Sequence, residues 1–575
     1  MLIKKISPKN RENYNDLSEC IENIKKNNMN SYLGAKGYSI YKSCLTPKII
    51  EFIKNELTVK PTLQNSYVEA KSFPIYQESE KKIYVPRYWG IAMFGHPKML
   101  KIPYGENINV RFEGLLRDYQ TNVLNEYLKA IDFGISDDKN KGNGSALIEL
   151  WTGAGKTVLG LKIIEVLKKK TIIFVHKTFL KNQWIERIQQ YLPNARIGSI
   201  QGQNIDIENK DIVLAMIQSV SMKTYNDTLF DSFGLSIYDE CHHMSSEVFC
   251  NCLKKCNTLY GLGLSATMNR KDGLTNVFKM YLGDICYKHY KKGNEDDVLV
   301  KAIEFTIDDD EYNEVERDFR GQVKYSTMVN KVSTLNMRSD FIVYVLESEL
   351  FINPNQQFIV LAQTKSLLNY LYRALVYKNF ASVGYYIGGM KESELKKSES
   401  KTIILATYSM AAEALDIKSL TSLLLASPKS DIVQAVGRIL REKHSNPLVI
   451  DIIDGHDVFQ NQFNKRRAFY NQKNYRIFRT SNKNYEHYVK YMRSLTTTTT
   501  TTTTTLLNIE NELFDVDKDS STTTSAMGNL QNLWNYLLTK KNKNANKNKN
   551  ANNANAENGN NAINEISEYK CLIKL

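Results

Sequence analysis

Two adjacent carboxylates beside a run of thiols and imidazoles are the first residues in this sequence that could do chemistry. They lie in the stretch IYDECHHMSS, residues 237–246, and are Asp239, Glu240, Cys241, His242 and His243. Three further cysteines follow in FCNCLKKC, at Cys250, Cys252 and Cys256. Thiols and imidazoles are typical ligands of zinc and iron–sulfur clusters, whereas paired carboxylates are typical of Mg²⁺ binding and the activation of water. The neighbouring motifs decide between these chemistries.

The spacing of the cysteines argues against a transition metal. The pattern C-x-C-x₃-C lies on a segment predicted to be helical and matches neither of the usual paired CxxC arrangements. A zinc or iron–sulfur site is the alternative on donor types alone. We expect buried or surface thiols instead.

A glycine-rich turn between a predicted strand and a predicted helix gives the carboxylates a partner. The stretch ELWTGAGKTVLGL, residues 149–161, would bring backbone N–H groups and a helix N-terminus to phosphate oxygens. Lys156 would reach the β and γ phosphates, and the Thr157 hydroxyl would coordinate Mg²⁺. Leu150 stands where the full P-loop pattern has glycine, so a plain strand-to-helix turn is the alternative. The predicted ATP-binding residues of this turn are Trp151, Thr152, Gly153, Ala154, Gly155, Lys156 and Thr157.

Such a turn predicts a second strand that ends in acids, because nucleotide hydrolysis needs a held metal ion and a polarised water. The stretch LSIYDE, residues 235–240, is that strand. We expect Asp239 to hold Mg²⁺ through its water shell and Glu240 to be the general base. The two carboxylates are therefore interpreted as parts of an ATP-hydrolysing site.

Short apolar runs alternate with amphipathic segments on either side of these motifs. Buried strands alternating with helices predict parallel sheets that are covered on both faces. The predicted strands of the first lobe are 145–150, 171–176, 211–216, 235–240 and 259–267, with helices over 156–170 and 179–192. Those of the second lobe are 355–363, 382–389, 401–409, 422–428 and 447–454.

In this order the motifs resemble those of a superfamily two helicase of the DExH type, over about residues 112–475. In the first lobe the matching stretches are LRDYQ at 116–120, HKTFLKNQW at 176–184, MIQSV at 216–220, DECH at 239–242 and SAT at 265–267. In the second lobe they are FIVLAQT at 358–364, ATYSMAAEALDI at 406–417 and QAVGRILR at 434–441.

The resemblance implies an α/β fold of two tandem RecA-like parallel-sheet lobes, with an N-terminal accessory domain and a disordered C-terminal tail. The predicted boundaries are 1–111 for the accessory domain, 112–292 for the first lobe, 293–340 for a linker, 341–480 for the second lobe and 481–575 for the tail.

The resemblance also implies roles for single residues, with ATP and Mg²⁺ as cofactors. Gln120 would contact the adenine base. Arg438 and Arg441, with Gln434, would act in catalysis by reaching the γ-phosphate across the cleft between lobes. The residues expected to couple the ATP site to movement are His242, Ser265, Thr267 and Asp416. The residues expected to contact nucleic acid are Lys177, Thr178, Gln218, Ser219, Thr364 and Thr407.

Three departures from the family pattern affect turn geometry and leave every charged catalytic group in place. Trp151 replaces a small residue or proline, Met268 replaces a proline, and Ala414 replaces a glycine. We expect these departures to affect the rate of the reaction and not its type.

The stretch GLGLSATMNRKDGLTNVF, with Arg270 to Asp272, resembles DNA-directed members of the superfamily. These are the TFIIH-type repair and transcription helicase, the phage recombination helicase and the poxvirus transcript-release helicase. We therefore expect a helicase or translocase that acts on DNA in transcript release or repair, with the transcription machinery as a partner. The alternatives are a DExH RNA helicase and a catalytically silent clamp that only binds ATP.

The bulk composition agrees with a polyanionic partner. The formal net charge is +14 and the pI is about 9.0, although an AT-rich genome would also enrich lysine. No apolar run approaches the length of a membrane span, and the first residues do not form a signal peptide. We expect a monomer inside the cell, in the nucleus, a viral factory or a virion.

Two further surfaces are candidates for nucleic-acid contact. The first is basic and aromatic and comprises Lys81, Lys82, Tyr84, Arg87, Tyr88, Trp89 and Phe94, for which a half-buried strand is the favoured alternative. The second is the basic stretch 464–473, which equally fits a solvated helix. In the tail, a threonine run at 496–505 and an asparagine–lysine tract at 540–561 predict disorder. Between them, one helical stripe would be formed by Leu530, Leu533, Trp534, Leu537 and Leu538.

Overall fold

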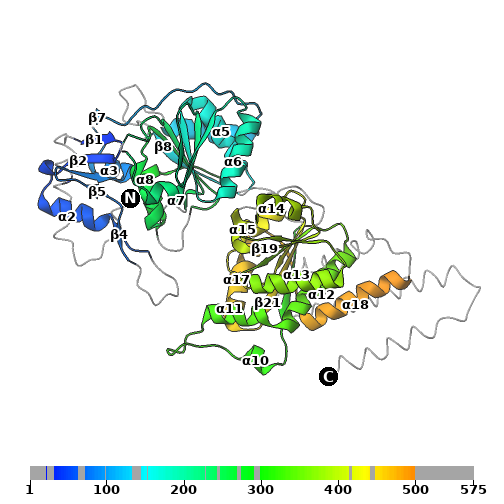
Figure 1. Ribbon diagram of the computed structural model, residues 1–575. Helices are drawn as coiled ribbons and strands as arrows, with labels where there is room; N and C mark the ends of the chain where they lie inside the picture. Colours follow the sequence, from blue (N-terminus) through cyan, green and yellow to red (C-terminus); the bar gives the residue numbers. More distant parts are fainter. Residues whose placement is uncertain are drawn as a thin grey trace, which may run out of the picture. The chain divides into compact units, whose positions relative to one another are not determined.

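The computed structural model describes residues 21, 31–61, 71–97, 99–131, 144–151, 153–226, 228–242, 246–268, 274–289, 298–413, 417–440 and 447–498 (Figure 1). Several predicted features lie outside these residues: Thr152, Arg270 to Asp272, Ala414, Asp416, Arg441 and the tail from residue 499 with its leucine-rich stripe. Within the described part of the chain, no helix is long and apolar enough to cross a membrane.

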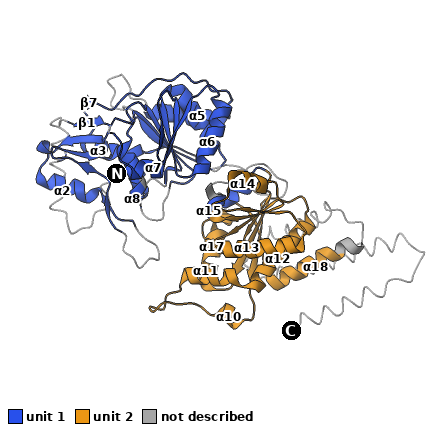
Figure 2. Cartoon of the chain, viewed as in Figure 1, with its two compact units in different colours: residues 1–294, 409–418, 434–441 blue, residues 295–408, 419–433, 442–575 orange. Residues whose placement is uncertain are grey.

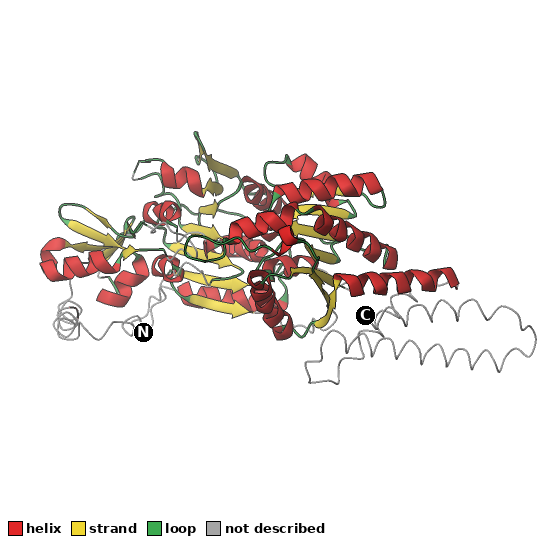
Figure 3. Cartoon of the chain, turned by 90° about the horizontal axis from the view of Figure 1, so that it is seen from below, coloured by secondary structure: helices red, strands yellow, loops and turns green. Residues whose placement is uncertain are grey.

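The chain divides into two compact units. Unit 1 comprises residues 1–294, 409–418 and 434–441, and unit 2 comprises residues 295–408, 419–433 and 442–575 (Figure 2). Each unit is built around one large sheet of parallel strands, with helices against it (Figure 3). The predicted α/β class with two parallel-sheet lobes is confirmed.

The large sheet of unit 1 has the strand order β11-β10-β12-β9-β13-β14-β8-β15, and all its neighbours are parallel except β10 and β11. Its strands are β8 (Ser145–Leu150), β9 (Thr171–Val175), β10 (Ile197–Gln201), β11 (Asn204–Asp206), β12 (Ile212–Met216), β13 (Leu235–Asp239), β14 (Tyr260–Ser265) and β15 (Ile285–His289). All five strands predicted for this lobe are present. β8, β9, β12 and β13 are buried along their whole length, which explains their unbroken apolar runs.

Helices cover both faces of this sheet. Side chains on one face pack with α4 (Asp118–Ile131), α5 (Lys156–Leu167) and α6 (Thr178–Tyr191). Those on the other face pack with α7 (Ile217–Met222), α8 (Glu247–Lys255) and α9 (Thr275–Leu282). Successive residues of a strand alternate between the two cores: Ile172 and Phe174 belong to one, Ile173 and Val175 to the other.

The N-terminal residues form a smaller sheet with strand order β5-β6-β2-β1-β7. Its strands are β1 (Ser31–Gly34), β2 (Gly37–Tyr41), β5 (Gln77–Glu78), β6 (Lys82–Val85) and β7 (Met99–Leu100). The segment also contains η3 (Lys42–Cys44), α2 (Pro47–Glu56), α3 (Arg87–Phe94) and the short pair β3 (Thr58–Val59) and β4 (Phe73–Pro74).

Packing joins the N-terminal segment, which was predicted as an accessory domain over residues 1–111, to the first lobe. Tyr38, Trp89 and Phe94 belong to the same apolar core as Phe174 and Tyr238 of the large sheet. The segment therefore shares a core with the first lobe and is part of unit 1.

The predicted basic and aromatic surface of this segment is divided by the fold. Arg87, Trp89 and Phe94 are buried, and Arg87 donates to the carbonyls of Thr258 and Leu259. The favoured alternative, a half-buried strand, is wrong for these three residues, because they lie on the helix α3, which packs them into the core.

The sheet of unit 2 has the order β18-β19-β17-β20-β21-β16-β22, and all its pairs are parallel. Its strands are β16 (Leu299–Phe305), β17 (Phe358–Ala362), β18 (Val383–Tyr386), β19 (Ile403–Thr407), β20 (Ser422–Leu425), β21 (Leu448–Asp454) and β22 (Arg476–Ser481). The helices of unit 2 are α10 (Asp310–Asn313), α11 (Tyr325–Thr334), α12 (Asn336–Ile352), α13 (Lys365–Lys378), α14 (Glu392–Glu399), α17 (Asp457–Gln472) and α18 (Asn482–Thr498). The two remaining helices, α15 (Tyr408–Glu413) and α16 (Val433–Ile439), lie mostly in the segments 409–418 and 434–441, which group with unit 1.

Two predicted boundaries of this lobe are wrong. The segment 293–340, predicted as a linker, contributes β16, which lies between β21 and β22 inside the sheet. The tail predicted from residue 481 begins instead with α18, whose Tyr485, Val489 and Met492 are buried in the core of unit 2. Apolar residues at helical spacing hold α18 against the sheet.

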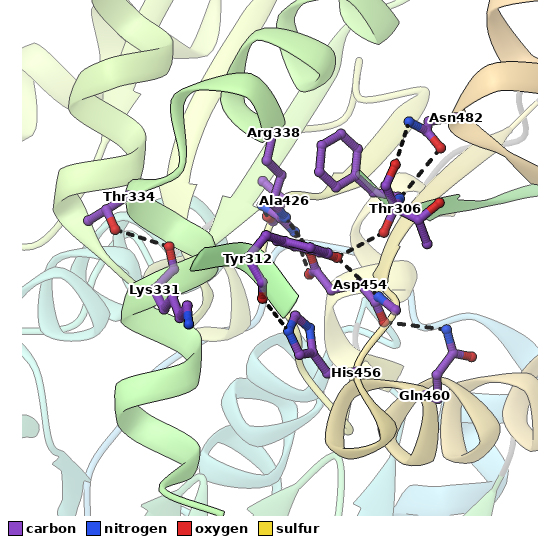
Figure 4. A network of polar contacts seen from close by, with 12 residues as sticks. Thr306, Tyr312, Lys331, Thr334, Arg338, Ala426, Asp454, His456, Gln460 and Asn482 are labelled. Carbon is purple, nitrogen blue, oxygen red and sulfur yellow. Dashed lines mark hydrogen bonds and ion pairs between the residues drawn. The ribbon is translucent and has the colours of Figure 1, made fainter. Parts of the chain in front are cut away.

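Buried ion pairs hold the layers of unit 2 together. Arg338 makes two hydrogen bonds to Asp454, with Nε–Oδ1 2.6 Å and Nη2–Oδ2 2.9 Å, and both side chains are inaccessible to solvent. Figure 4 shows Tyr312 joining this pair: its hydroxyl lies 3.4 Å from Asp454 Oδ1, and its carbonyl lies 2.7 Å from His456 Nε2. Arg338 also donates to the carbonyl of Ala426 at 2.8 Å, which connects α12 to the end of β20.

Two similar pairs lie in the same unit. Lys301 of β16 is bonded to Glu349 of α12 at 2.8 Å, and Arg466 of α17 is bonded to Asp451 of β21 at 2.7 and 2.8 Å. Arg466 belongs to the basic stretch 464–473, for which a nucleic-acid contact patch and a solvated helix were the two expectations. Neither holds at Arg466, which is buried, because the buried Asp451 carboxylate requires a cation beside it.

We expect Arg338→Met to lower the free energy of unfolding by about 3–5 kcal/mol, since Asp454 would be left buried without its cation. Urea denaturation followed by circular dichroism measures this change. Lys378→Met is the control, because the 2.8 Å pair of Lys378 with Glu347 is exposed and should contribute less than about 1 kcal/mol. Equal losses in the two variants would contradict the importance of the buried pair.

Candidate functional site

The predicted site residues of unit 1 meet at one edge of the large sheet. β13, β14 and β8 are consecutive neighbours and run parallel. The carboxyl ends of parallel strands lie at the same edge, which is where ligands bind in open α/β sheets. The acidic pair after β13, the residues after β14 and the glycine-rich turn after β8 therefore converge.

The turn after β8 has a backbone that depends on glycine. Gly153 and Gly155 have φ of 86° and 75°, in the left-handed region, and Gly155 is the residue before α5. A Cβ at Gly155 would lie 2.6 Å from the Gln120 amide nitrogen. The turn therefore combines a helix N-terminus with a closely approachable backbone, as a phosphate site requires.

Lys156 begins α5 and points back over the turn toward the acidic strand. Its Nζ lies 3.5 Å from the carbonyl of Leu150 and 3.7 Å from Glu240 Oε1. The side chain is 12% exposed. A partly buried ammonium beside a carboxylate at this edge fits a triphosphate and its metal ion.

Gln120 holds the glycine-rich turn. Its Nε2 donates to the carbonyls of Ala154 and Gly155 at 3.0 and 3.4 Å, and its Oε1 accepts from Arg117 N at 3.0 Å. The hydroxyl of Tyr119 donates to the same Ala154 carbonyl at 2.6 Å. The predicted adenine contact stays a prediction, and the structure adds the fixing of the turn to the role of Gln120.

Asp239 is a buried carboxylate at the end of β13. Its Oδ2 accepts from Trp184 Nε1 at 2.9 Å, and its Oδ1 accepts from the backbone N–H of Glu240 at 3.1 Å. Burial raises the pKa of Asp239, and the neighbouring negative charge of Glu240 raises it further, while the hydrogen bond from Trp184 lowers it. A buried carboxylate in this environment is stabilised by a cation, which fits the predicted Mg²⁺ role.

Sequence reasoning missed Trp184. Its signal was present, because Leu180, Trp184 and Ile188 recur at helical spacing on α6 and are all buried. A buried indole N–H needs an acceptor, and the nearest strand end offers a carboxylate.

Glu240 follows Asp239 with a φ of 49°, which a residue other than glycine rarely adopts. This turn brings its Oε2 to 3.3 Å from Ser265 Oγ and 3.4 Å from His242 Nδ1. His242 Nδ1 lies 2.8 Å from Ser265 Oγ, which also accepts from Thr267 N at 3.1 Å. The acidic strand end and the SAT segment thus form one hydrogen-bonded network.

The cysteines near the acidic pair are thiols inside the apolar core. Cys241, Cys250, Cys252 and Cys256 are at most 2% exposed. Cys252 Sγ lies 3.0 Å from Ser221 Oγ and donates to the carbonyl of Ile217, and burial raises its pKa to about 12. Among the described residues, no group of three or more His, Cys, Asp or Glu side chains could hold a metal ion.

The residues predicted to contact nucleic acid lie at the carboxyl ends of strands in both sheets. Lys177 and Thr178 follow β9 at the start of α6, and Gln218 and Ser219 follow β12 within α7. Gln218 donates to the carbonyl of His176 at 2.9 Å, and the hydroxyl of Ser219 accepts from Gly202 N at 2.9 Å.

In unit 2, Thr364 precedes α13 after β17, and Thr407 is the last residue of β19. Arg438 lies on α16 and is buried. Gln434 lies on the same helix, but its side chain is outside the described part of the chain. The roles assigned to these residues stay predictions.

The chain is similar to several known proteins. The protein family described as "Type III restriction enzyme, res subunit" matches residues 113–270. A protein of Acanthamoeba polyphaga mimivirus that carries the name ATP-dependent RNA helicase L396 is 33% identical over 472 residues, 78% of this chain and 87% of that protein. A protein of Invertebrate iridescent virus 6 named as helicase 161L is 24% identical over 395 residues, 64% of this chain and 85% of that protein. Among solved structures, S. cerevisiae Dbp5 bound to RNA and ADP BeF3 gives a TM-score of 0.45 at 13% identity, covering 66% of this chain and 93% of that one.

We expect Trp184→Phe to shift the acid limb of ATP hydrolysis to higher pH. The hydrogen bond from Trp184 lowers the pKa of Asp239, so its loss leaves burial and the charge of Glu240 to raise that pKa further. Asp239 would then be protonated, and unable to hold a cation, at a higher pH. A pH–rate profile at saturating ATP and Mg²⁺ measures the shift. Trp89→Phe, at a buried tryptophan of the N-terminal segment, should leave the limb in place; an unmoved limb in Trp184→Phe would refute the role of the indole.

Proposed function

We propose that the chain couples ATP hydrolysis to movement along DNA. The chain belongs to the superfamily two ATP-dependent helicases, together with proteins of large DNA viruses, and the proposal proceeds from this membership. The observation that supports this proposal best is the meeting of the glycine-rich turn, Lys156, Asp239 and Glu240 at one edge of the sheet. A motor of this kind needs these groups together, because phosphoryl transfer is catalysed mainly by positioning and by charge.

The site residues have distinct tasks in this proposal. Backbone N–H groups of the turn and Lys156 bind the phosphates, and Thr157 and Asp239 hold Mg²⁺, which would neutralise phosphate charge when bound. Glu240 accepts a proton from the attacking water. Its contact with Ser265 and His242 supports a coupling role for the SAT segment, because a shift of Glu240 would disturb that network.

Arg438 and Arg441 are assigned to the transition state. Guanidinium groups there stabilise the charge on the transferred phosphoryl group, which raises rates by roughly 10³–10⁵ in related enzymes. Arg438 is buried on α16, and the assignment rests on the resemblance of residues 434–441 to the corresponding helicase motif.

DNA is the proposed substrate, and transcript release or repair is the proposed process. The support is the resemblance of the first-lobe motifs to DNA-directed helicases, together with the net charge of +14. The mimivirus relative carries the name of an RNA helicase, which favours RNA as the second candidate.

The test of substrate class is the rate of ATP hydrolysis with single-stranded DNA, duplex DNA or single-stranded RNA as activator. We expect DNA to stimulate turnover, and steeply less so as salt rises, because contacts with phosphates release counterions. Stimulation of ATP hydrolysis by RNA alone would refute DNA as the substrate and support an RNA helicase instead.

We expect Lys156→Ala and Glu240→Gln to lower the rate of ATP hydrolysis by on the order of 10²–10⁴, since each removes a group that acts on the transferred phosphate or on its water. Steady-state phosphate release measures the rate. Glu126→Gln on α4, whose partner Lys129 is 73% exposed, is a matched surface control. Tight ATP binding by the unmodified protein without turnover would instead support the silent clamp.

A further inference from the structure

The small N-terminal sheet has one face in the core and one face turned away from it. Register pairs Tyr32 with Ser39, Ser39 with Tyr84, and Tyr41 with Lys82. Residues that pair across strands point to the same side of a sheet. The opposite side carries Leu33, Tyr38, Ile40, Ile83 and Val85, all at most 2% exposed.

The outer face combines tyrosine rings with lysine ammonium groups. We define it by Tyr32, Tyr41 and Tyr84 with Lys36, Lys82 and Lys101. Lys82 Nζ lies 5.1 Å from the Tyr32 ring centre and 4.8 Å from that of Tyr41, and it donates to the Tyr32 hydroxyl at 3.0 Å. Lys101 Nζ lies 4.9 Å from the Tyr32 ring, and Lys36 Nζ lies 6.0 Å from the Tyr84 ring.

At the described strand positions of this face, the charge is of one sign. Besides the three tyrosines and Lys82, the strand residues of the outer face are Ser39, Gln77 and Met99, so its described strand positions contain no acid. Glu78 at the edge points to the opposite side and is already paired, at 2.9 Å each, with Lys42 and Lys54. The pKa of Lys82 is raised, first by its hydrogen bond with Tyr32, so this ammonium is charged at neutral pH.

This combination fits a polyanion whose units carry flat rings. Aromatic side chains on a sheet stack on bases, and lysines at their edges contact the phosphates between those bases. A lysine stem is flexible, so an ammonium group that covers a ring can move to a phosphate oxygen. An acidic protein would satisfy the lysines but would leave the three rings without a partner.

We propose that the outer face of the N-terminal sheet is a second nucleic-acid-binding surface, which takes single-stranded nucleic acid by stacking on Tyr32, Tyr41 and Tyr84 and by phosphate contacts with Lys36, Lys82 and Lys101. The surface rests on the proposed function for its ligand class, but it is separate from the ATP site. It lies in unit 1 on strands that carry none of the helicase motifs.

Direct binding tests the lysines. The double variant Lys82→Glu/Lys101→Glu is compared with Lys129→Glu/Lys396→Glu, which changes two exposed lysines on α4 and α14 by the same total charge. Fluorescence anisotropy with labelled dT20 and U20, without nucleotide and over a range of salt, measures affinity. We expect on the order of tenfold weaker binding and a salt slope reduced by roughly 1.4 for the face variant alone. Equal affinity of the two double variants would overturn the proposal.

Stacking has its own test. Tyr41→Leu keeps an apolar side chain and should lower affinity by on the order of tenfold without changing the salt slope. Photo-crosslinking of a 5-bromouracil oligonucleotide to the unmodified protein gives a second measurement that does not depend on variant folding. Crosslinked peptides should include residues 31–41 or 82–85; crosslinks confined to residues 176–184, 216–220 and the second-unit motifs would overturn the surface.

The rate of ATP hydrolysis without polynucleotide separates this proposal from the previous one. The face variants should keep that basal rate, because none of the changed residues lies at the ATP site. If the protein hydrolyses ATP without polynucleotide and the face variants bind single-stranded nucleic acid as tightly as the unmodified protein, only the proposed surface is refuted. Lost binding of the face variants in a protein that never hydrolyses ATP supports the surface and refutes only the motor.

Discussion

A carboxylate placed in a nearly dry environment is the constraint around which unit 1 is organised. Asp239 is 8% exposed at the end of a central strand, and its pKa is raised by burial and by the charge of Glu240. Such a group is tolerated only where donors and cations approach it. Trp184 supplies one donor, the Glu240 backbone supplies another, and Lys156 stands 3.7 Å from the adjacent Glu240 carboxylate. The parallel sheet makes this possible because it brings three strand ends to one edge.

Most of the site could be predicted because its signals are local. A glycine-rich turn, a strand that ends in acids and a serine-containing strand end are each contiguous in sequence, and a parallel sheet then brings them together. The contacts that could not be predicted join distant segments. Gln120 bonds to the carbonyl of Ala154, 34 positions away, and Trp184 bonds to Asp239, 55 positions away. Such pairs depend on how α4 and α6 pack on the sheet, which no short pattern encodes.

The elements of the fold also divide into those with a local sequence signal, which were predicted, and those that depend on distant residues, which were not. Strands with long apolar runs were predicted in both lobes, since burial on both faces leaves a plain signal. β16 and β22 were missed because charged residues interrupt them: Lys301 and Arg479 stand in their middles. Lys301 is nevertheless fully buried, because Glu349 neutralises it and Tyr485 donates to that carboxylate. A strand that contains a buried charged residue is therefore difficult to predict from its own sequence when the counterion lies on a helix that is distant in the chain.

The left-handed backbone conformation at Glu240 limits which amino acids can occupy this position. Asparagine and aspartate tolerate this conformation best after glycine, but glycine has no carboxylate, asparagine has no charge, and aspartate is one methylene shorter. Valine and isoleucine are excluded by their branched Cβ alone. Substitution at position 240 is thus restricted by the backbone conformation as well as by the need for a carboxylate. The left-handed conformation of the glutamate costs about 1–3 kcal/mol.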